Sequence, residues 1–254
     1  SAPRSERYSV RVKERFAWPL AVIASLCILY GFFIEVDWIE VTHQTIKAPV
    51  TSPLRILHLT DLHVRAFGRR ERAVLDTIAA EMPDIILITG DFLTGSRKTE
   101  ALLELLAQLK APLGVWAVWG NWEYWSPKEA KDALGRAPSI KLLENESAHP
   151  RDDVWIIGLD DLMYGRPDAE KAFRDVGTGG AKIVLFHEPL EFEAIHRPFD
   201  LGLAGHTHGG QLMLTDSVGA GPPLYKYWSG RYQKRSGAPL APCVGGNGTG
   251  NWFP

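Results

Sequence analysis

Apolar residues recur along the chain with two spacings that predict different elements. Short, nearly continuous apolar runs predict buried strands, which we place at residues 56–60, 85–89, 115–119, 155–159, 182–186 and 201–204. Apolar residues at helical spacing predict helices over residues 70–81, 98–109 and 128–134. Strands that alternate with helices in this way are typical of a layered α/β domain.

The longest apolar run lies near the N-terminus. Residues 16–34 (FAWPLAVIASLCILYGFFI) contain no charged side chain. As a helix with a rise of 1.5 Å per residue they span about 28 Å, close to the roughly 30 Å hydrocarbon core of a bilayer. Trp18 near one end, and Tyr30 and Trp38 near the other, are typical of membrane interfaces. We predict a retained membrane anchor helix; a cleaved signal peptide or a buried core helix are the alternatives.

Charged residues flank this apolar run asymmetrically. The preceding tail, residues 1–15, is basic, whereas Glu35, Asp37 and Glu40 follow the run. The positive-inside rule then places the N-terminus in the cytoplasm and the remaining chain outside it. We expect a single-pass protein of a bacterial-type inner (cytoplasmic) membrane. A monotopic helix that enters one leaflet would instead leave the following domain in the cytoplasm.

The pattern divides the chain into a basic tail (1–15), an anchor (16–34), a connector (35–53) and one large domain (54–254). Apolar and polar residues alternate over residues 39–43 of the connector, which predicts an opening strand. Charge is nearly balanced, with 28 basic and 30 acidic residues. Nucleic-acid binders usually carry a basic surplus, so we expect no nucleic-acid partner.

A set of Asp, His and Asn residues follows the predicted strands and forms a candidate metal site. These residues are Asp61, His63, Asp91, Asn121, His187, His206 and His208. Carboxylate and imidazole ligands suit Mn, Fe and Zn better than Ca or a thiolate-bound ion. Strand-end residues meet at one rim of an α/β sheet, so ligands distant in sequence can share one site.

The order of these residues resembles that of a known family. They occur as Asp61-Leu62-His63, Gly90-Asp91, Gly120-Asn121, a lone His187, and Gly205-His206-Thr207-His208. The calcineurin-like metallophosphoesterases carry the motifs D-x-H, G-D, G-N-H-[D/E], H and G-H-x-H in this order, and the match covers roughly residues 53–250. Five motifs in order are far more specific than one. The resemblance implies a two-sheet α/β sandwich flanked by helices and a phosphoester hydrolase.

The resemblance also implies a ligand set for two divalent ions. Asp61, His63 and His208 would hold one ion, and Asn121, His187 and His206 the second. Asp91 would bridge both, as an anionic ligand between two cations should. Mn is the expected ion, with Fe and Zn as alternatives. Asp91, Asn121 and His206 are the candidates for catalysis, in which a metal-activated hydroxide attacks phosphorus.

The chain departs from the family pattern at Trp122, where the family usually has His. That His is credited with stabilising phosphate or protonating the leaving group, and an indole N–H does neither well. Three alternatives follow: the substrate has a good leaving group, a basic residue replaces the His, or catalysis is weak. Candidate replacements follow the first motif, where their alternative role is a solvated helix face: Arg65, Arg69, Arg70 and Arg72.

Within the family, residues 34–42 (IEVDWIEVT) resemble the connector of the membrane-anchored branch, which is associated with phosphodiesterase activity. Related enzymes cleave UDP-2,3-diacylglucosamine in lipid A synthesis. We therefore predict hydrolysis of a lipid-linked phosphodiester or pyrophosphate at the membrane. The alternatives are a broad envelope phosphodiesterase and a weakly catalytic metal-binding protein. The aromatic and basic loop 222–235 suits either a membrane interface or ordinary packing over the domain.

The remaining polar residues near the motifs have structural interpretations. His58 lies in an apolar strand and is expected to be a hydrogen-bonded core residue, with contact to the metal ligands as the alternative. Asp160 and Asp161 end a predicted strand and are expected in a turn. Glu188 is expected to cap the helix that follows it.

Overall fold

A computed structural model describes most of the chain. The described residues are 17–30, 39–94, 99–208, 213–215, 218–219, 227, 230–232, 243–245 and 251–253. They belong to two compact units, Ser1–Trp38 and Ile39–Pro254. The second unit contains all of the candidate metal ligands.

Residues 17–30 of the first unit form a helix with exposed side chains. Its large apolar side chains include Trp18, Ile23 and Leu26. Among the described residues, no helix has both the length and the apolar character that crossing a membrane requires. The predicted anchor, residues 16–34, is described only between residues 17 and 30, and its other residues lie outside the described part of the chain.

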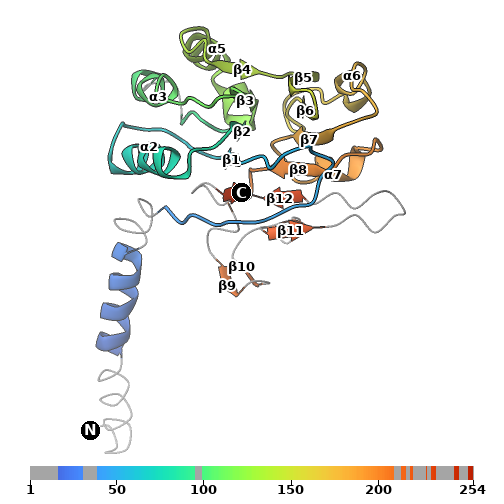
Figure 1. The fold of residues 1–254 in the computed structure, drawn as a ribbon. Helices are drawn as coiled ribbons and strands as arrows, with labels where there is room; N and C mark the ends of the chain where they lie inside the picture. The colour runs from blue at the N-terminus through green and yellow to red at the C-terminus, as the bar shows by residue number, and fades with distance from the viewer. Residues whose placement is uncertain are drawn as a thin grey trace, which may run out of the picture. The chain divides into compact units, whose positions relative to one another are not determined.

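The first sheet of the second unit has the strand order β13-β1-β2-β3-β4. Figure 1 labels its strands β1 to β4. Strands β1 to β4 are parallel, and β13 pairs with β1 in the antiparallel direction. The strands are β1 (Ile56–Leu59), β2 (Ile85–Thr89), β3 (Val115–Val118), β4 (Ile140–Leu142) and β13 (Asn251–Phe253). The connecting helices are α2 (Arg69–Glu81), α3 (Thr99–Leu106), α4 (Asn121–Trp125) and α5 (Pro127–Gly135).

The second sheet repeats this plan, with the order β11-β12-β8-β7-β6-β5. Strands β6, β7, β8 and β12 are parallel, and the edge strands β5 and β11 are antiparallel to their neighbours. The strands are β5 (Glu146–Arg151), β6 (Val154–Gly158), β7 (Ala181–Leu185), β8 (Leu201–Ala204), β11 (Gly230–Tyr232) and β12 (Cys243–Gly245). Its helices are α6 (Ala169–Ala172) and α7 (Glu191–Ala194), and β9 (Met213–Thr215) pairs with β10 (Val218–Gly219) outside both sheets.

Alternating side chains along the strands build the layers. In β2, Ile85 and Leu87 pack in the cluster that joins the two sheets, which also contains Ile183 and Leu203. Ile86 and Ile88 of the same strand face the other way and join the cluster formed with α2, α3 and α5. Because successive strand residues point to opposite faces, a central strand buried on both faces is apolar throughout. A third cluster packs α6 and α7 on the outer face of the second sheet (Figure 1).

The predicted two-sheet sandwich with flanking helices is confirmed. All six predicted strands and all three predicted helices form, with ends that differ by at most a few residues. The sequence patterns missed β5 because its residues, ESAHPR, are polar and include a proline, as an edge strand allows. The predicted opening strand at residues 39–43 is wrong, since only a single bridge position, His43, occurs there.

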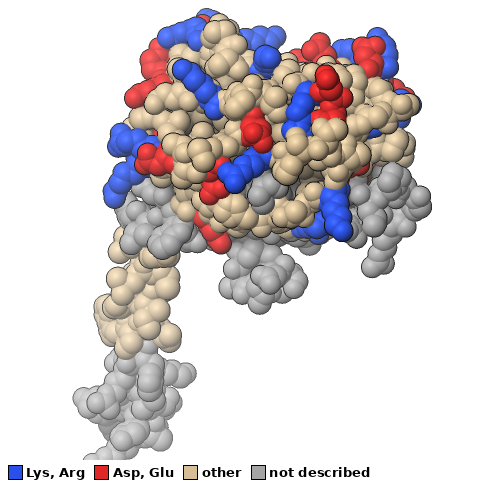
Figure 2. Space-filling view, in the orientation of Figure 1, with Lys and Arg blue, Asp and Glu red and all other residues tan. Residues whose placement is uncertain are grey.

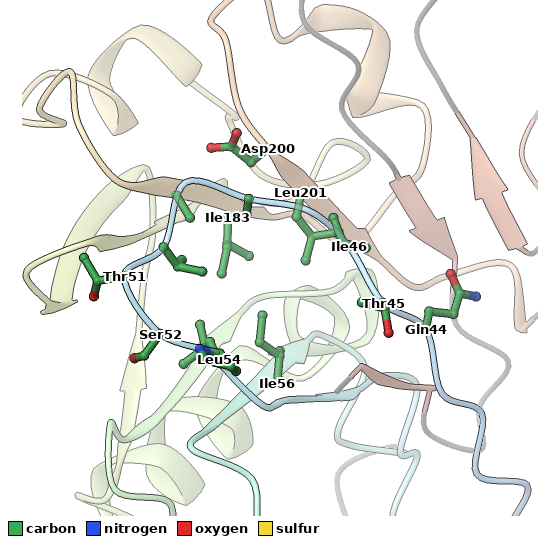
Figure 3. Close-up of a pocket in the computed structure, with 14 residues that line it drawn as sticks. Gln44, Thr45, Ile46, Thr51, Ser52, Leu54, Ile56, Ile183, Asp200 and Leu201 are labelled. Atoms are coloured by element: carbon green, nitrogen blue, oxygen red, sulfur yellow. The ribbon is translucent and has the colours of Figure 1, made fainter.

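The connector passes over the ends of the sheets at which β1, β7 and β8 begin. Beneath it lies a cavity of about 390 Å³, in which Ile46 of the connector and Leu54, the residue that follows the connector, face Ile183 and Leu201 of the second sheet (Figure 3). The candidate metal ligands follow the other ends of these parallel strands. The cavity and the candidate metal site are therefore at opposite ends of the sandwich. On the face seen in Figure 2, acidic and basic side chains are interspersed.

Candidate metal centre

The seven candidate ligands follow the carboxyl ends of five parallel strands. Asp61 and His63 follow β1, Asp91 follows β2, and Asn121 opens α4 directly after β3. The remaining three follow strands of the second sheet: His187 after β7, and His206 and His208 after β8. Both sheets therefore contribute to one rim, and the structure brings all seven side chains together there.

Asp61, His63 and His208 form the first cluster. One potential ligand atom from each lies within 4.8 Å of the others. The Nε2 atoms of His63 and His208 are 3.2 Å apart, and their rings stack with centroids 5.0 Å apart. His208 Nε2 is also 3.4 Å from Asp61 Oδ1. Two imidazole nitrogens and a carboxylate thus converge on one point.

Asp91, His187 and His206 form the second cluster, in which one potential ligand atom from each residue also lies within 4.8 Å of the others. Asn121 belongs to it as well. Its Oδ1 atom lies 3.1 Å from His187 Nε2 and 3.0 Å from His206 Nδ1. This arrangement unites the three residues that the family resemblance places on one ion.

Asp91 lies between the two clusters. Its Oδ2 atom is 3.6 Å from His63 Nε2 and 3.4 Å from His187 Nε2. Its other oxygen, Oδ1, accepts a hydrogen bond of 2.9 Å from the backbone N–H of Trp122. One carboxylate oxygen therefore faces both sets of ligands while the second is held by the protein.

The backbone at these residues is unusual. Five of the seven candidate ligands have a positive φ: Asp61 (50°), His63 (41°), Asp91 (54°), His206 (68°) and His208 (48°). In the described chain only Met82 and Asn145 share this left-handed conformation among non-glycine residues. Such residues are uncommon and cluster at functional sites, where surrounding packing offsets the local strain.

Backbone carbonyls orient two of the imidazoles. His187 Nδ1 is 2.7 Å from the carbonyl of Thr89, and His63 Nδ1 is 3.2 Å from the carbonyl of Leu93. A carbonyl only accepts, so Nδ1 carries a proton in both rings, and Nε2 is the nitrogen that can bind a metal ion in the cluster. The hydrogen bonds therefore select the tautomer that a metal ligand requires.

The electrostatics of the site favour cations. Burial lowers the pKa of His187, but the charges of Asp91 and Asp61 more than offset it and raise this pKa to about 10. Burial, followed by the charge of His187, lowers the pKa of His206 to about 4. The negative field that favours a proton on His187 equally favours a metal cation at Nε2.

Glu123 is an important residue to which the sequence analysis assigned no role. It is buried and accepts three backbone hydrogen bonds, from Asp91 and Gly120 at Oε2 and from Leu93 at Oε1. Burial and then the charge of Asp91 raise the pKa of Glu123 to about 8. The available signal was its place three residues after Gly120, where a glutamate reaches back to the backbone N–H of the residue that caps the helix.

Of the four arginines after the first motif, two contact other residues of the protein and the other two are exposed. Arg70 donates to the carbonyl of Leu62 at 2.7 Å and pairs with Glu71, and Arg72 lies over the ring of Phe67. Arg65 and Arg69 are exposed. Arg70 therefore braces the loop that follows β1.

Two other polar predictions are confirmed. His58 is buried, and its Nε2 atom forms a hydrogen bond of 2.7 Å with Thr89 Oγ1. Burial lowers the pKa of His58 to about 3. Asp160 and Asp161 shape a turn, in which their carboxylates accept from the N–H groups of Arg166 and Tyr164.

Of two further predictions near the site, the one for Glu188 is wrong and the one for the loop 222–235 stays a prediction. The helix-capping role of Glu188 is wrong, because α7 begins after Leu190 and has no side-chain cap. The loop 222–235 lies largely outside the described residues. Its Tyr227 is buried and packs against Phe192.

Comparison with known proteins identifies the family. Residues 54–210 match the calcineurin-like phosphoesterase domain. The chain is 33% identical over 197 residues to a metallophosphoesterase of Aquifex aeolicus, covering 73% of this chain and 74% of that protein. It is 30% identical over 202 residues to phosphodiesterase YaeI of Escherichia coli, covering 73% and 72%. It is 29% identical over 220 residues to UDP-2,3-diacylglucosamine pyrophosphatase LpxG of Chlamydia trachomatis, covering 63% and 65%.

The chain therefore belongs to the calcineurin-like phosphoesterase family and is a metal-dependent phosphoester hydrolase. The family uses divalent metal ions, and the two side-chain groups described above are the candidate ligands for them.

Proposed function

We propose that this protein hydrolyses a lipid-linked phosphodiester or pyrophosphate at a membrane, using two divalent ions. The observation that carries the two-ion proposal is the position of Asp91 Oδ2, 3.6 Å from a histidine of one cluster and 3.4 Å from a histidine of the other. A carboxylate shared by two sets of ligands fits a bridge between two cations better than a single-ion site.

The donor set supports this use of the residues. Asp61, His63 and His208 would hold one ion, and Asn121, His187 and His206 the other. Mixed imidazole and oxygen donors suit Mn, and also Fe or Zn. When bound, the two ions lower the pKa of a coordinated water and offset charge that develops on the phosphoryl oxygens.

Residues of the chain hold this arrangement in place. The N–H of Trp122 keeps Asp91 Oδ1 occupied and so directs Oδ2 to both clusters. The N–H of His206 donates to both oxygens of Asp61, at 3.1 and 3.0 Å. Asn121 and His206 are in contact within the second cluster and are the further candidates for contact with the phosphoryl group.

Trp122 bears on the class of substrate. Its indole N–H carries no charge and cannot protonate an alkoxide efficiently, so general acid catalysis from this position is weak. A phosphate or nucleotide leaves readily as an anion and requires no such proton. The residue therefore favours a pyrophosphate, or a diester with an acidic leaving group.

The lipid and membrane parts of the proposal rest on two further observations. The helix at residues 17–30 exposes large apolar side chains, including Trp18, Leu20 and Leu26. The relative LpxG is named for a diacylated, lipid-like substrate. We infer that residues 16–34 attach the protein to a membrane. Flotation with liposomes should show binding by the full chain and loss of binding when residues 1–34 are removed.

The test of the activity compares two substrates. Purified protein with Mn²⁺ is assayed with bis-p-nitrophenyl phosphate and UDP-2,3-diacylglucosamine, beside Asp91→Ala and the exposed control Asp152→Ala. Turnover of the UDP-lipid that Asp91→Ala abolishes and Asp152→Ala retains would support the lipid pyrophosphatase. Turnover of the small diester alone would indicate a broader phosphodiesterase and contradict the lipid substrate. No turnover of either, with metal bound, would contradict the enzymatic proposal.

A further inference from the structure

Three aromatic side chains form a continuous row that begins at the candidate metal site. The ring of His63 contacts Trp122 with centroids 5.2 Å apart, Trp122 contacts Trp125 at 5.0 Å, and Trp125 contacts Tyr164 at 5.7 Å. We call Trp122, Trp125 and Tyr164 the aromatic row. The row connects a candidate metal ligand to the protein surface.

The row consists of residues from two segments, α4 and the turn after β6, which hydrogen bonds hold next to each other. Trp122 and Trp125 are three residues apart in α4, so they lie on the same helix face. Tyr164 belongs to the turn after β6. The hydroxyl of Tyr124 in α4 donates to Asp160, and Asp161 accepts from the N–H of Tyr164 at 2.7 Å. Buried carboxylates thus hold Tyr164 beside α4.

The outer part of the row is exposed. Trp125 is 52% exposed, Tyr164 is 49% exposed, and the residues before Tyr164 add Met163 at 52% and Leu162 at 38%. Large apolar side chains that gather on a surface usually mark a binding site. Here they adjoin a site built for a charged phosphoryl group. A ligand that fits both parts has a phosphoester at one end and an apolar group at the other.

The angles between the rings favour a flexible hydrocarbon chain over a planar group as the bound ligand. The ring planes are inclined by 58° between Trp122 and Trp125 and by 74° between Trp125 and Tyr164. Rings inclined in this way offer no common flat face for one planar base. A flexible hydrocarbon chain can follow such a surface, and the aliphatic side chains of Leu162 and Met163 extend it.

We propose that the aromatic row binds the hydrocarbon chain of the substrate and so selects amphiphilic phosphoesters. This inference rests on the proposed phosphoesterase function and specifies its substrate class. The chain of the individual substrate molecule, rather than a bilayer surface, is the group that occupies the row. Trp122, Trp125 and Tyr164 are then specificity-determining residues.

The experiment uses p-nitrophenyl alkyl phosphates with methyl, butyl and octyl groups, below the concentrations at which they aggregate. Each hydrolysis breaks the same bond between phosphorus and p-nitrophenolate, and water supplies the new oxygen. We expect kcat/KM for the octyl ester to exceed that for the methyl ester by at least tenfold. Trp125→Ala and Tyr164→Ala should each reduce this octyl-to-methyl ratio at least threefold. Met82→Ala, which removes a 69% exposed side chain at the end of α2, should retain the wild-type ratio.

Each other outcome has a definite meaning. If the wild type hydrolyses none of the esters, the proposed function fails. Equal kcat/KM for methyl and octyl esters leaves the function standing and overturns the aromatic-row proposal, as does an unchanged ratio in both folded variants. Two further assays test other ligands: the p-nitrophenyl phenyl ester, and the octyl ester in aggregates or vesicles. A phenyl ester preferred over the octyl ester indicates a planar ligand, and an octyl preference seen only with aggregates or vesicles indicates a membrane contact. Both results contradict binding of a substrate chain. Circular dichroism confirms that the variants fold.

Discussion

Consecutive residues of α4 have separate tasks at the candidate metal centre. Asn121 directs its amide oxygen to the second cluster, Trp122 holds Asp91 through its backbone, and Glu123 ties together the loops after β2 and β3. Tyr124 then fastens the turn after β6. A single short helix thus links ligands from the first sheet to a segment of the second.

The first prediction concerns Glu123. Glu123→Gln keeps the shape of the side chain but has only one acceptor oxygen for three backbone N–H groups. At least one buried donor then lacks a partner, which costs about 1–3 kcal/mol. We expect the free energy of unfolding in urea to fall by about this amount and phosphodiesterase activity to fall at least tenfold. Unfolding and activity equal to wild type would show that Glu123 does not brace the two loops.

The second prediction concerns Trp122, whose ring lies 5.2 Å from that of His63. Trp122→His should introduce a proton donor beside the phosphoryl site, and general acid catalysis typically contributes about 10²–10⁴-fold. Rates are measured for aryl phosphodiesters whose leaving phenols span a range of pKa. We expect a gain of at least about tenfold for the poorest leaving group and little change for p-nitrophenol, since only the former requires a proton. An unchanged dependence on leaving-group pKa would contradict this role for position 122.

At the scale of elements, the loops after the strands approach one another so closely that glycine is required. A Cβ on Gly205, directly after β8, would lie 1.9 Å from Thr60 Oγ1 and 2.6 Å from Asp61 Oδ2. A Cβ on Gly90, which has φ of +86°, would lie 2.6 Å from the backbone of Gly120. The ligand-bearing loops are therefore packed against each other, which fixes the separation of the two clusters.

The third prediction follows from this packing. Gly205→Ala should displace Thr60 and Asp61, lower the free energy of unfolding by about 1–3 kcal/mol, and weaken Mn²⁺ binding. Gly135→Ala is the matched control, because no atom lies within 4 Å of its Cβ at the end of α5. It should be neutral or stabilise the protein by up to about 1 kcal/mol. Equal effects of the two substitutions on unfolding and on metal binding would contradict the close approach.

The sequence pattern predicted the strands that are buried on both faces, because such strands are rich in apolar residues. It did not predict features that depend on contacts between distant loops. The first four residues of strand β2, Ile85 to Ile88, are all apolar because both faces of the strand are covered, so its pattern was clear. The motif residues could be placed at strand ends for the same reason. The left-handed backbone of Asp61 and the three hydrogen bonds of Glu123 depend on contacts between loops that are distant in sequence. A pattern of single residues carries no such information.

At the scale of the whole molecule, the connector is fastened to the second sheet of its own unit. Asp153, in the turn directly before β6, accepts from both the N–H and the hydroxyl of Thr51, and pairs with Arg151. This contact lies at the end of the sandwich that also contains the cavity beneath the connector. The bonds from Thr51, and then Arg151, hold the pKa of Asp153 well below its usual value of 3.8.

The fourth prediction uses the sign of this shift. A carboxyl group with a depressed pKa in the folded state stabilises the protein above the unfolded pKa of about 3.8, and the contribution is lost as pH falls through the folded pKa. Asp153→Asn should therefore lower Tm at pH 7, and its difference from wild type should shrink as pH falls below about 3.8. Asp152→Asn, an exposed neighbour, should match wild type at every pH. A difference for Asp153→Asn that does not depend on pH would contradict the linkage.

The central claim is that seven residues from both sheets hold two ions, and the number of Mn²⁺ ions bound per chain tests it most directly. Metal content is measured by mass spectrometry after equilibrium dialysis, for wild type, His208→Ala, His206→Ala and the exposed control His196→Ala. The structure predicts two ions for wild type and for His196→Ala, and about one for each of the other variants, since each loses a ligand from a different cluster. One ion or none in wild type, or two ions retained in both cluster variants, would contradict the dinuclear site.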